Sequence, residues 1–132
     1  MATKPTRYIT YPEAVWIHIQ LMRLEGEIRY GVFDRELIES ALARPRQAAA
    51  YEDADVIRQA ATLFYGLIKS HPWVGGNKRT ATAIVNIFLK RNSFKLTSVT
   101  KDNVELSLAV EADQWKVDEI EVWLRQHTEA IS

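Results

Sequence analysis

The apolar residues of this chain recur mainly at intervals of three and four positions, which is the spacing of one face of an α-helix. The first such stretch predicts a helix that begins after Thr10 and runs to Gly26. Thr10 and Glu13 have the spacing of a capping box, and Pro12 stands in the first turn, where its missing N–H costs nothing. Gly26 is expected to end this helix in a turn.

Two more helices are predicted between Asp34 and Pro72. Asp34 is a favourable N-cap for a short helix that is expected to end near Pro45. Residues 45–52 have no clear period and are interpreted as an irregular or extended connector. A longer helix starts near Asp53 and must end before Pro72, since proline disfavours helical geometry in the residue ahead of it. Its apolar positions are Ile57, Ala60, Ala61, Phe64, Leu67 and Ile68.

The second half of the chain predicts three further helices. The first follows a loop at residues 72–76 and ends near Arg91, and the second begins at Thr100. The apolar positions of the last one are Val117, Ile120, Trp123 and Leu124. Only residues 94–99 have the composition of a strand, and this stretch is short. The pattern therefore predicts one all-α domain over residues 1–132, a compact bundle of about six helices with the loop between two central ones.

Charge and composition narrow the possible functions. The 17 basic and 17 acidic residues give a formal net charge of zero, whereas direct nucleic-acid binders usually carry a basic surplus. The chain has no cysteine, so neither disulfides nor thiolate metal sites are available. The N-terminus lacks the apolar region of a secretory signal, and no apolar run reaches the roughly 20 residues that span a bilayer. We expect a soluble cytoplasmic protein that binds neither nucleic acid nor membranes.

The segment from His71 to Arg79 carries the candidate chemistry. Gly75 and Gly76 let the backbone turn tightly and let an anion approach main-chain N–H groups. A helix begins directly after them, so its first turn presents free N–H donors and a partial positive charge. Asn77, Lys78 and Arg79 add an amide, an ammonium and a guanidinium at the same place. Together these groups predict a phosphate-binding site.

His71 stands at the end of the preceding helix, beside this predicted phosphate site. An imidazole exchanges protons near neutral pH, so His71 can take the proton of a hydroxyl group. A base next to a phosphate cradle is the minimum needed to transfer a phosphoryl or nucleotidyl group to a protein hydroxyl. The duller interpretation is that His71 only caps its helix, since an imidazole near a helix C-terminus is favourable. Basic residues in a first helical turn, such as Lys78 and Arg79, oppose the helix dipole unless an anion binds there, which favours function.

The same segment resembles the Fic/Doc signature, His-x-Phe-x-Asp/Glu-Gly-Asn-x-Arg, and Lys78 resembles the death-on-curing branch of that family. The run from Leu37 to Gln47 is similar to that branch as well. The resemblance implies a fold of about six helices and a toxin that uses ATP and is inhibited by a separate antitoxin. By position, it implies that His71 is the base and that Asn77, Lys78 and Arg79 hold phosphates, with Gly76 permitting close approach.

The resemblance also bears on the reaction and its target. Most Fic proteins transfer AMP to a hydroxyl, whereas in the death-on-curing branch the lysine is thought to reverse ATP so that the terminal phosphoryl group moves. The known target of that branch is elongation factor Tu, a protein of the translation machinery. The run Leu21 to Gly26 resembles the inhibitory helix of other Fic proteins but lacks its leading hydroxyl residue. Inhibition by a partner protein is therefore the expectation.

Two positions depart from the family pattern. Trp73 stands where the family has Phe, a mild change for a packing anchor. Gly75 replaces an Asp or Glu that would position Mg²⁺, and a glycine has no oxygen ligand to offer. Three alternatives follow: another carboxylate substitutes, the metal is held mainly by nucleotide and water, or the chain is catalytically silent. The silent chain would be either a natural pseudoenzyme that serves as a binding module or the product of an attenuating substitution at residue 75. No metal ligand is predicted from the sequence.

Arg44, Arg46 and Tyr51 lie just before the helix that leads to His71. The resemblance implies a flap near the target-binding groove in this region, so these residues are candidates for target docking. The alternative is that they belong to an ordinary surface loop. His18 and His127 have no partners at a meaningful spacing and are interpreted as structural or exposed.

Overall fold

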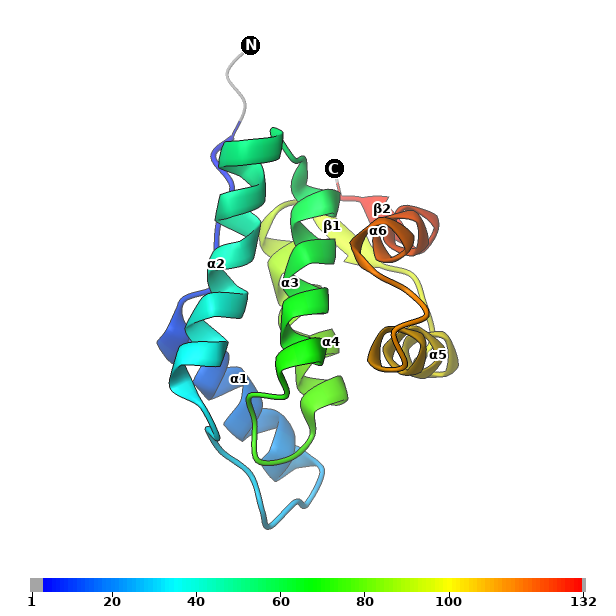
Figure 1. Cartoon of the computed structure of the whole chain (residues 1–132). Coiled ribbons are helices and arrows are strands. Elements are labelled where there is room, and N and C mark those ends of the chain that lie inside the picture. Colours follow the sequence, from blue (N-terminus) through cyan, green and yellow to red (C-terminus); the bar gives the residue numbers. More distant parts are fainter. Residues whose placement is uncertain (1–3, 132) are drawn as a thin grey trace.

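The fold is built around an antiparallel pair of helices, α3 (Val56–Ser70) and α4 (Asn77–Arg91), joined by the loop that contains the candidate chemistry. A computed structural model describes residues 4–131. α2 (Arg35–Glu52) packs along one side of α3, and α5 (Thr100–Glu111) and α6 (Val117–Gln126) lie on the other side (Figure 1). The predicted all-α bundle of about six helices is confirmed.

α1 (Tyr11–Leu24) crosses the lower part of the bundle and contacts α4. Its start follows the prediction. The Thr10 hydroxyl accepts a hydrogen bond from the Glu13 amide at 3.3 Å, and the Glu13 carboxylate accepts one from the Thr10 amide at 3.0 Å. The capping box thus satisfies two amides that the helix itself leaves unpaired.

The prediction of an irregular connector at residues 45–52 is wrong, because α2 continues through this segment. Pro45 and Ala48 lie on the buried face of the helix, and the alanines that follow Pro45 are the strongest helix formers. Burial of this face and high propensity outweigh the single hydrogen bond that Pro45 cannot donate. Asp53 ends the helix in the left-handed conformation, and Asp55 caps α3.

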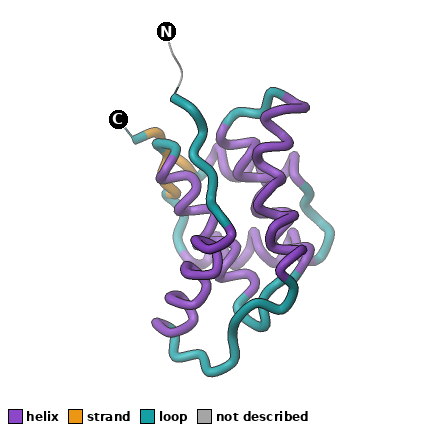
Figure 2. Tube along the Cα trace, turned by 90° about the vertical axis from the view of Figure 1, so that its left-hand side faces the viewer, coloured by secondary structure: helices purple, strands orange, loops and turns teal. Residues whose placement is uncertain are grey.

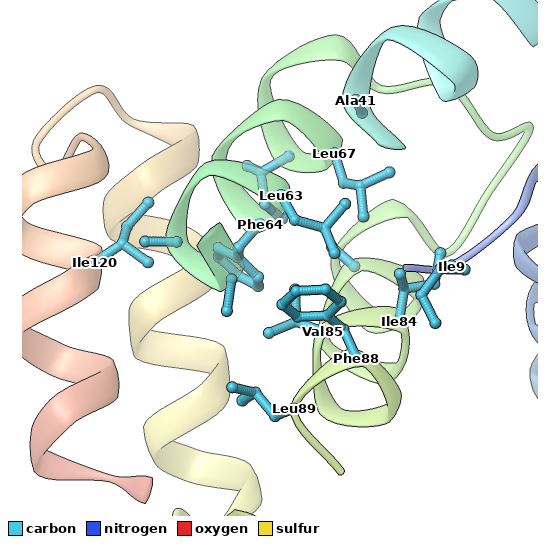
Figure 3. Packing of buried hydrophobic residues seen from close by; sticks show 14 of the residues in the cluster. Ile9, Ala41, Leu63, Phe64, Leu67, Ile84, Val85, Phe88, Leu89 and Ile120 are labelled. Atoms are coloured by element: carbon cyan, nitrogen blue, oxygen red, sulfur yellow. The ribbon is translucent and has the colours of Figure 1, made fainter. Parts of the chain in front are cut away.

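The hydrophobic core lies between α3 and α4 and extends to α6. Phe64 from α3 and Phe88 from α4 are both buried, and Figure 3 shows them among the core side chains that these two helices contribute. Ile120 closes the core from α6. The stretch before α1 runs alongside the bundle (Figure 2), and its Ile9 is buried against the core. Because both faces of α3 are covered, its two ends are held in fixed positions.

A short antiparallel pair of strands completes the fold. β1 (Phe94–Leu96) covers the first half of the predicted strand and pairs with β2 (Thr128–Ala130), which the sequence pattern did not indicate. The register places Phe94 opposite Ala130 and Leu96 opposite Thr128. Among residues 4–131, no helix is both long and apolar enough to cross a bilayer.

Candidate active site

A cavity of about 720 Å³ opens beside the start of α4, a volume typical of small-molecule sites. It follows α4 from Asn77 to Lys90, a rise of about 20 Å at 1.5 Å per residue. The C-terminal part of α1 and the start of α5 also contribute to its wall. Of the predicted site residues, it is lined by His71, Gly76, Asn77, Lys78 and Arg79.

His71 is the C-cap of α3 and adopts the left-handed conformation, with φ 45° and ψ 57°. A residue other than glycine pays about 1–2 kcal/mol for this conformation, and such strain is often found at functional sites. The strained backbone turns the chain out of α3 and leaves the imidazole half exposed at the cavity. The structure thus places His71 at a helix end beside the predicted phosphate site, as the sequence indicated.

Gly76 is the N-cap of α4, and two observations explain why it is a glycine. Its φ is +64°, a conformation that side chains disfavour. A Cβ at this position would also lie 2.5 Å from Cε of Met22 and 3.4 Å from Nη2 of Arg79. No side chain caps α4, so its first-turn amides have no side-chain acceptor at this end. Free amides at a helix start can bind an anion.

Asn77 has a structural contact that the sequence did not reveal. Its amide oxygen accepts a hydrogen bond from the Trp73 amide, and its amide nitrogen donates to the Trp73 carbonyl, both at 3.0 Å. This pair of bonds closes the loop between α3 and α4. Asn77 therefore shapes the loop between α3 and α4 through its side chain, whereas direct contact with phosphate stays a prediction.

Trp73 is a packing anchor, as expected from its place in the segment. The side chain is 2% exposed, and its ring stacks on His18 with centroids 4.3 Å apart. Its indole nitrogen is buried and has no hydrogen-bond partner. Two contacts at Trp73 thus hold the loop between α3 and α4: the indole ring stacks on His18, and the Trp73 backbone is hydrogen-bonded to the Asn77 side chain.

His18 is a buried structural histidine that ties three segments together. Its Nε2 accepts a hydrogen bond from the Gly31 amide at 3.0 Å, so the neutral ring carries its proton on Nδ1 and donates to the Thr80 hydroxyl at 2.8 Å. Burial, assisted by the positive charge of Arg79, lowers the pKa of His18 to about 4. His18 therefore stays neutral at physiological pH and positions the start of α4.

The two basic residues of the site are paired with carboxylates from distant parts of the chain. Lys78 Nζ lies 3.1 Å from Oε2 of Glu111, at the end of α5. Arg79 binds Glu25 and Glu27, with a distance of 3.2 Å to Glu27 Oε1. Glu25 lies in the run that lacks the hydroxyl residue of the inhibitory helix. An incoming phosphate must compete with these carboxylates for both cations.

Gly75 leaves the loop without an acidic side chain, and the donors around it do not form a dedicated Mg²⁺ site. A Cβ at residue 75 would lie 3.3 Å from the carbonyl oxygen of Arg29, so a larger residue needs a small adjustment there. Among residues 4–131, no cluster of three or more His, Asp or Glu side chains could hold a metal ion. The nearby carboxylates Glu25, Glu27 and Glu111 already neutralise Arg79 and Lys78.

The structure does not bring Arg44, Arg46 and Tyr51 to the cavity. All three lie on α2, which reaches the start of α3, whereas His71 lies at the end of α3 (Figure 1). Arg44 stacks over the Tyr65 ring at 5.6 Å. Arg46 stacks over the Tyr8 ring at 4.5 Å and lines a separate cavity. Tyr51 is 87% exposed and therefore accessible to a partner, but it lies near the end of α2 that reaches the start of α3, whereas His71 follows the other end of α3.

The segment that lies beside the His71 loop is instead residues 26–34. Val32 forms a β-bridge with Trp73, and the Val74 amide donates to the Gly31 carbonyl at 2.9 Å. Ile28 is 92% exposed and Phe33 is 74% exposed. Sequence reasoning missed this segment. The available signal was the presence of Ile28 between Gly26 and Gly31 and of Phe33 just after them, two large apolar residues in a segment outside the predicted helices.

Comparison with known proteins places the site in a family context. A sequence model described as the Fic/DOC family matches residues 8–89, which is more than half of the 132-residue chain and includes the whole segment from His71 to Arg79. A search of curated proteins finds no significant match.

Proposed function

The chain belongs to the Fic/DOC family, and from this premise we propose that it transfers the terminal phosphoryl group of ATP to a Ser or Thr hydroxyl of a protein. Family membership indicates the coarser activity, modification of a protein by transfer from a nucleotide. Lys78 supports the finer one, because this residue marks the resemblance to the death-on-curing branch. ATP is proposed as the substrate, with any Mg²⁺ carried on its phosphates.

The proposed reaction uses one base and one phosphate cradle. His71 takes the proton of the attacking hydroxyl, whose oxygen forms a bond to the terminal phosphorus. The bond from that phosphorus to the bridging oxygen breaks, and ADP leaves with the electron pair. The free amides at the start of α4, with Lys78 and Arg79, bind the phosphate oxygens and stabilise their charge. Gly76 lets the phosphates approach the backbone.

The observation that carries this proposal is the convergence of His71 and Lys78 on one cavity at an uncapped helix start. A histidine that served only as a helix cap would not need this cavity. A basic first turn is unfavourable for α4 itself, so its presence is explained by an anionic ligand.

The cellular role that we propose is that of a toxin in a toxin–antitoxin module. In this role the protein acts in the cytoplasm, its target belongs to the translation machinery, with elongation factor Tu as the first candidate, and a separate antitoxin inhibits it. The resemblance to the death-on-curing branch supports each of these points.

Two other functions compete with this one. AMP transfer to a hydroxyl would use the same base and cradle with the nucleotide in the opposite direction. A catalytically silent binding module is favoured by Gly75, which offers no metal ligand. It would retain the fold and the groove without turnover.

A labelling experiment separates the three functions. The purified protein is incubated with elongation factor Tu and ATP labelled at the α- or the γ-phosphate. Transfer of the γ-label supports the proposal, transfer of the α-label supports AMP transfer, and transfer of neither label, with and without Gly75→Asp, supports the silent module. His71→Ala should abolish any transfer. His127→Ala is the matched control, because His127 lies on Trp123 away from the cavity.

Growth measurements test the toxin role independently. Expression should arrest growth, and His71→Ala should relieve the arrest. Harmless expression of the unaltered chain that becomes toxic in Gly75→Asp would instead identify a site that lacks only its acidic residue.

The target-docking segment can be tested in the same assay. We propose that residues 26–34 dock the target, because they pair with the His71 loop and expose Ile28 and Phe33. Phe33→Ser should raise KM for the target without changing ATP binding, whereas Tyr51→Ser should leave both unchanged. The reverse result would support the docking role that the sequence predicted for the α2 residues.

A further inference from the structure

Glu111 faces two residues of the active-site segment at once, although it is 32 residues or more away from both in the sequence. Its Oε2 lies 3.1 Å from Nζ of Lys78 and 3.6 Å from Nε2 of His71. The Glu111 side chain is one-third exposed, so it is neither buried in the core nor free in solvent. One carboxylate oxygen thus lies between the proposed base and the phosphate-binding ammonium.

A second contact explains how Glu111 is held there. Lys69, two residues before His71, places its Nζ 2.5 Å from Oδ1 of Asp113 and 3.5 Å from the carbonyl oxygen of Glu111. Lys69 therefore ties the end of α5 to the end of α3. His71 and Glu111 both lie within two residues of these Lys69 contacts. The packing of α3 against α5 therefore fixes the distance between their backbones.

The charges around Glu111 indicate which anion it replaces. Lys78 is proposed to bind a phosphate oxygen, and His71 is proposed to receive a proton next to the same phosphate. An anion that pairs with Lys78 stands where a phosphate oxygen would bind, and Glu111 does so beside His71. Glu111 is such an anion, supplied by the protein itself.

We propose that Glu111 is a counter-ion that Lys78 exchanges for the substrate phosphate, and that the displaced carboxylate then holds the His71 ring. This inference rests on the proposed function for the identity of the substrate. In the empty site Glu111 neutralises Lys78. When a phosphate oxygen takes Lys78, the Glu111 carboxylate loses its cation, and the nearest cationic or hydrogen-donating partner left to it is His71 Nε2, which lies 3.6 Å away in the empty site.

In this arrangement Glu111 is a positioning residue. A carboxylate beside Nε2 of His71 holds the hydrogen on that nitrogen, leaves Nδ1 to accept the proton of the hydroxyl, and stabilises the imidazolium that then forms. Glu111 would thus weaken substrate binding, because it competes for Lys78, and would speed the chemical step. A purely structural residue would not produce these two opposite effects.

The experiment measures binding by calorimetry with two probes, inorganic tripolyphosphate and ATP, in the full-length protein. Glu111→Gln removes the charge but keeps the size of the side chain. We expect it to bind both probes about fivefold more tightly, the effect of one partly exposed ion pair that no longer competes. In a Lys78→Met background the same substitution should bring no gain. Glu105→Gln, on an exposed face of α5, is the matched control and should change neither affinity.

The transfer assay supplies the second measurement. Glu111→Gln should lower both KM for ATP and kcat, and Glu111→Asp should recover part of the lost kcat. Weaker or unchanged tripolyphosphate binding in Glu111→Gln would overturn the proposal, as would a gain that persists without Lys78. If the unaltered protein binds tripolyphosphate but transfers nothing, the proposed function fails, while the binding comparison still decides whether Glu111 competes for Lys78.

Discussion

The two ends of α4 are built in opposite ways. At the C-terminal end, Lys90 and Arg91 lie in the last turn, where positive charge is favourable. The Asn92 side chain donates to the Phe88 carbonyl at 2.8 Å, and Arg91 is paired with Glu13 from α1. Every feature of this end stabilises the helix.

The N-terminal end has the reverse composition. Lys78 and Arg79 lie in the first turn, where positive charge opposes the helix dipole, and no acidic residue accompanies them. Its cap is Gly76, which offers no side-chain acceptor. Both ends present an arginine to carboxylates from α1 or the turn after it, and of these two arginines Arg79 lines the cavity whereas Arg91 does not. The C-terminal end thus stabilises the helix, whereas the N-terminal end carries the groups of the proposed phosphate site.

The backbone at the two ends should give the largest contrast. Gly76→Ala places a methyl group 2.5 Å from Met22 in a left-handed conformation, so we expect a loss of about 3 kcal/mol or more in the free energy of unfolding. Ser93, just past the other end, has φ 70° with a side chain in place, so Ser93→Gly should gain up to about 1 kcal/mol. Urea denaturation measures both. A Gly76→Ala protein as stable as the unaltered one would contradict the comparison.

The pH dependence of stability should also differ between the ends. His18, which holds Thr80 near the start of α4, has a pKa lowered to about 4, below the 6.5 of an unfolded histidine. The unfolded state therefore takes up a proton first, and stability should fall by up to about 3 kcal/mol as pH drops from 6.5 to 4.

Glu13, at the other end, acts in a lower window. Its hydrogen bond from Arg91 lowers the pKa of Glu13 from 4.5 to about 2, so its contribution is present above pH 4.5 and is lost as pH falls toward 2. Urea titrations at a series of pH values should show that His18→Gln flattens the curve between pH 6.5 and 4. Glu13→Gln should flatten it only below pH 4.5. A curve that His18→Gln leaves unchanged would mean that folding does not lower the pKa of this histidine.

The two arginines of α4 give the smallest and most specific contrast. Arg79→Met should weaken ATP binding about tenfold, since a charge-assisted contact to phosphate is lost. Stability should hardly change, because the loss of the pairs with Glu25 and Glu27 is offset by the removal of a positive charge from the first turn of α4. Arg91→Met should leave ATP binding unchanged and cost about 1 kcal/mol of stability, a value limited by solvent screening of the Glu13 pair. Calorimetry and urea denaturation measure the two effects, and equal losses of affinity in both variants would remove the distinction.

Much of the fold was predictable because it depends on local patterns. The capping box at Thr10 and the cap at Asp34 have short-range signatures, and both were found where they were expected. The segment 45–52 was mispredicted, because Pro45 was taken as a stop signal. Burial of Pro45 and Ala48 against the rest of the bundle carries the helix on, and this packing has no local signature.

The candidate site shows the same division. The spacing of His71, Gly76, Lys78 and Arg79 was sufficient to predict a base beside an anion site, because these residues lie within nine positions of one another. The side chains that complete it, Glu25, Glu27, Glu111 and the buried His18, were not found in advance. Each reaches the site from another helix or turn. Of these residues, His18 had been interpreted only as structural or exposed, and Glu25 only as part of a run that does not match the inhibitory helix.

The sequence alone thus determined the helix boundaries that caps specify and the chemical groups offered at the start of α4. Only the tertiary structure decided which carboxylates oppose Lys78 and Arg79, and that residues 26–34 rather than the α2 residues lie beside His71. The physical reason is the range of the interactions. Caps and helical periodicity act over three or four residues, whereas ion pairs and loop contacts depend on how separate helices pack.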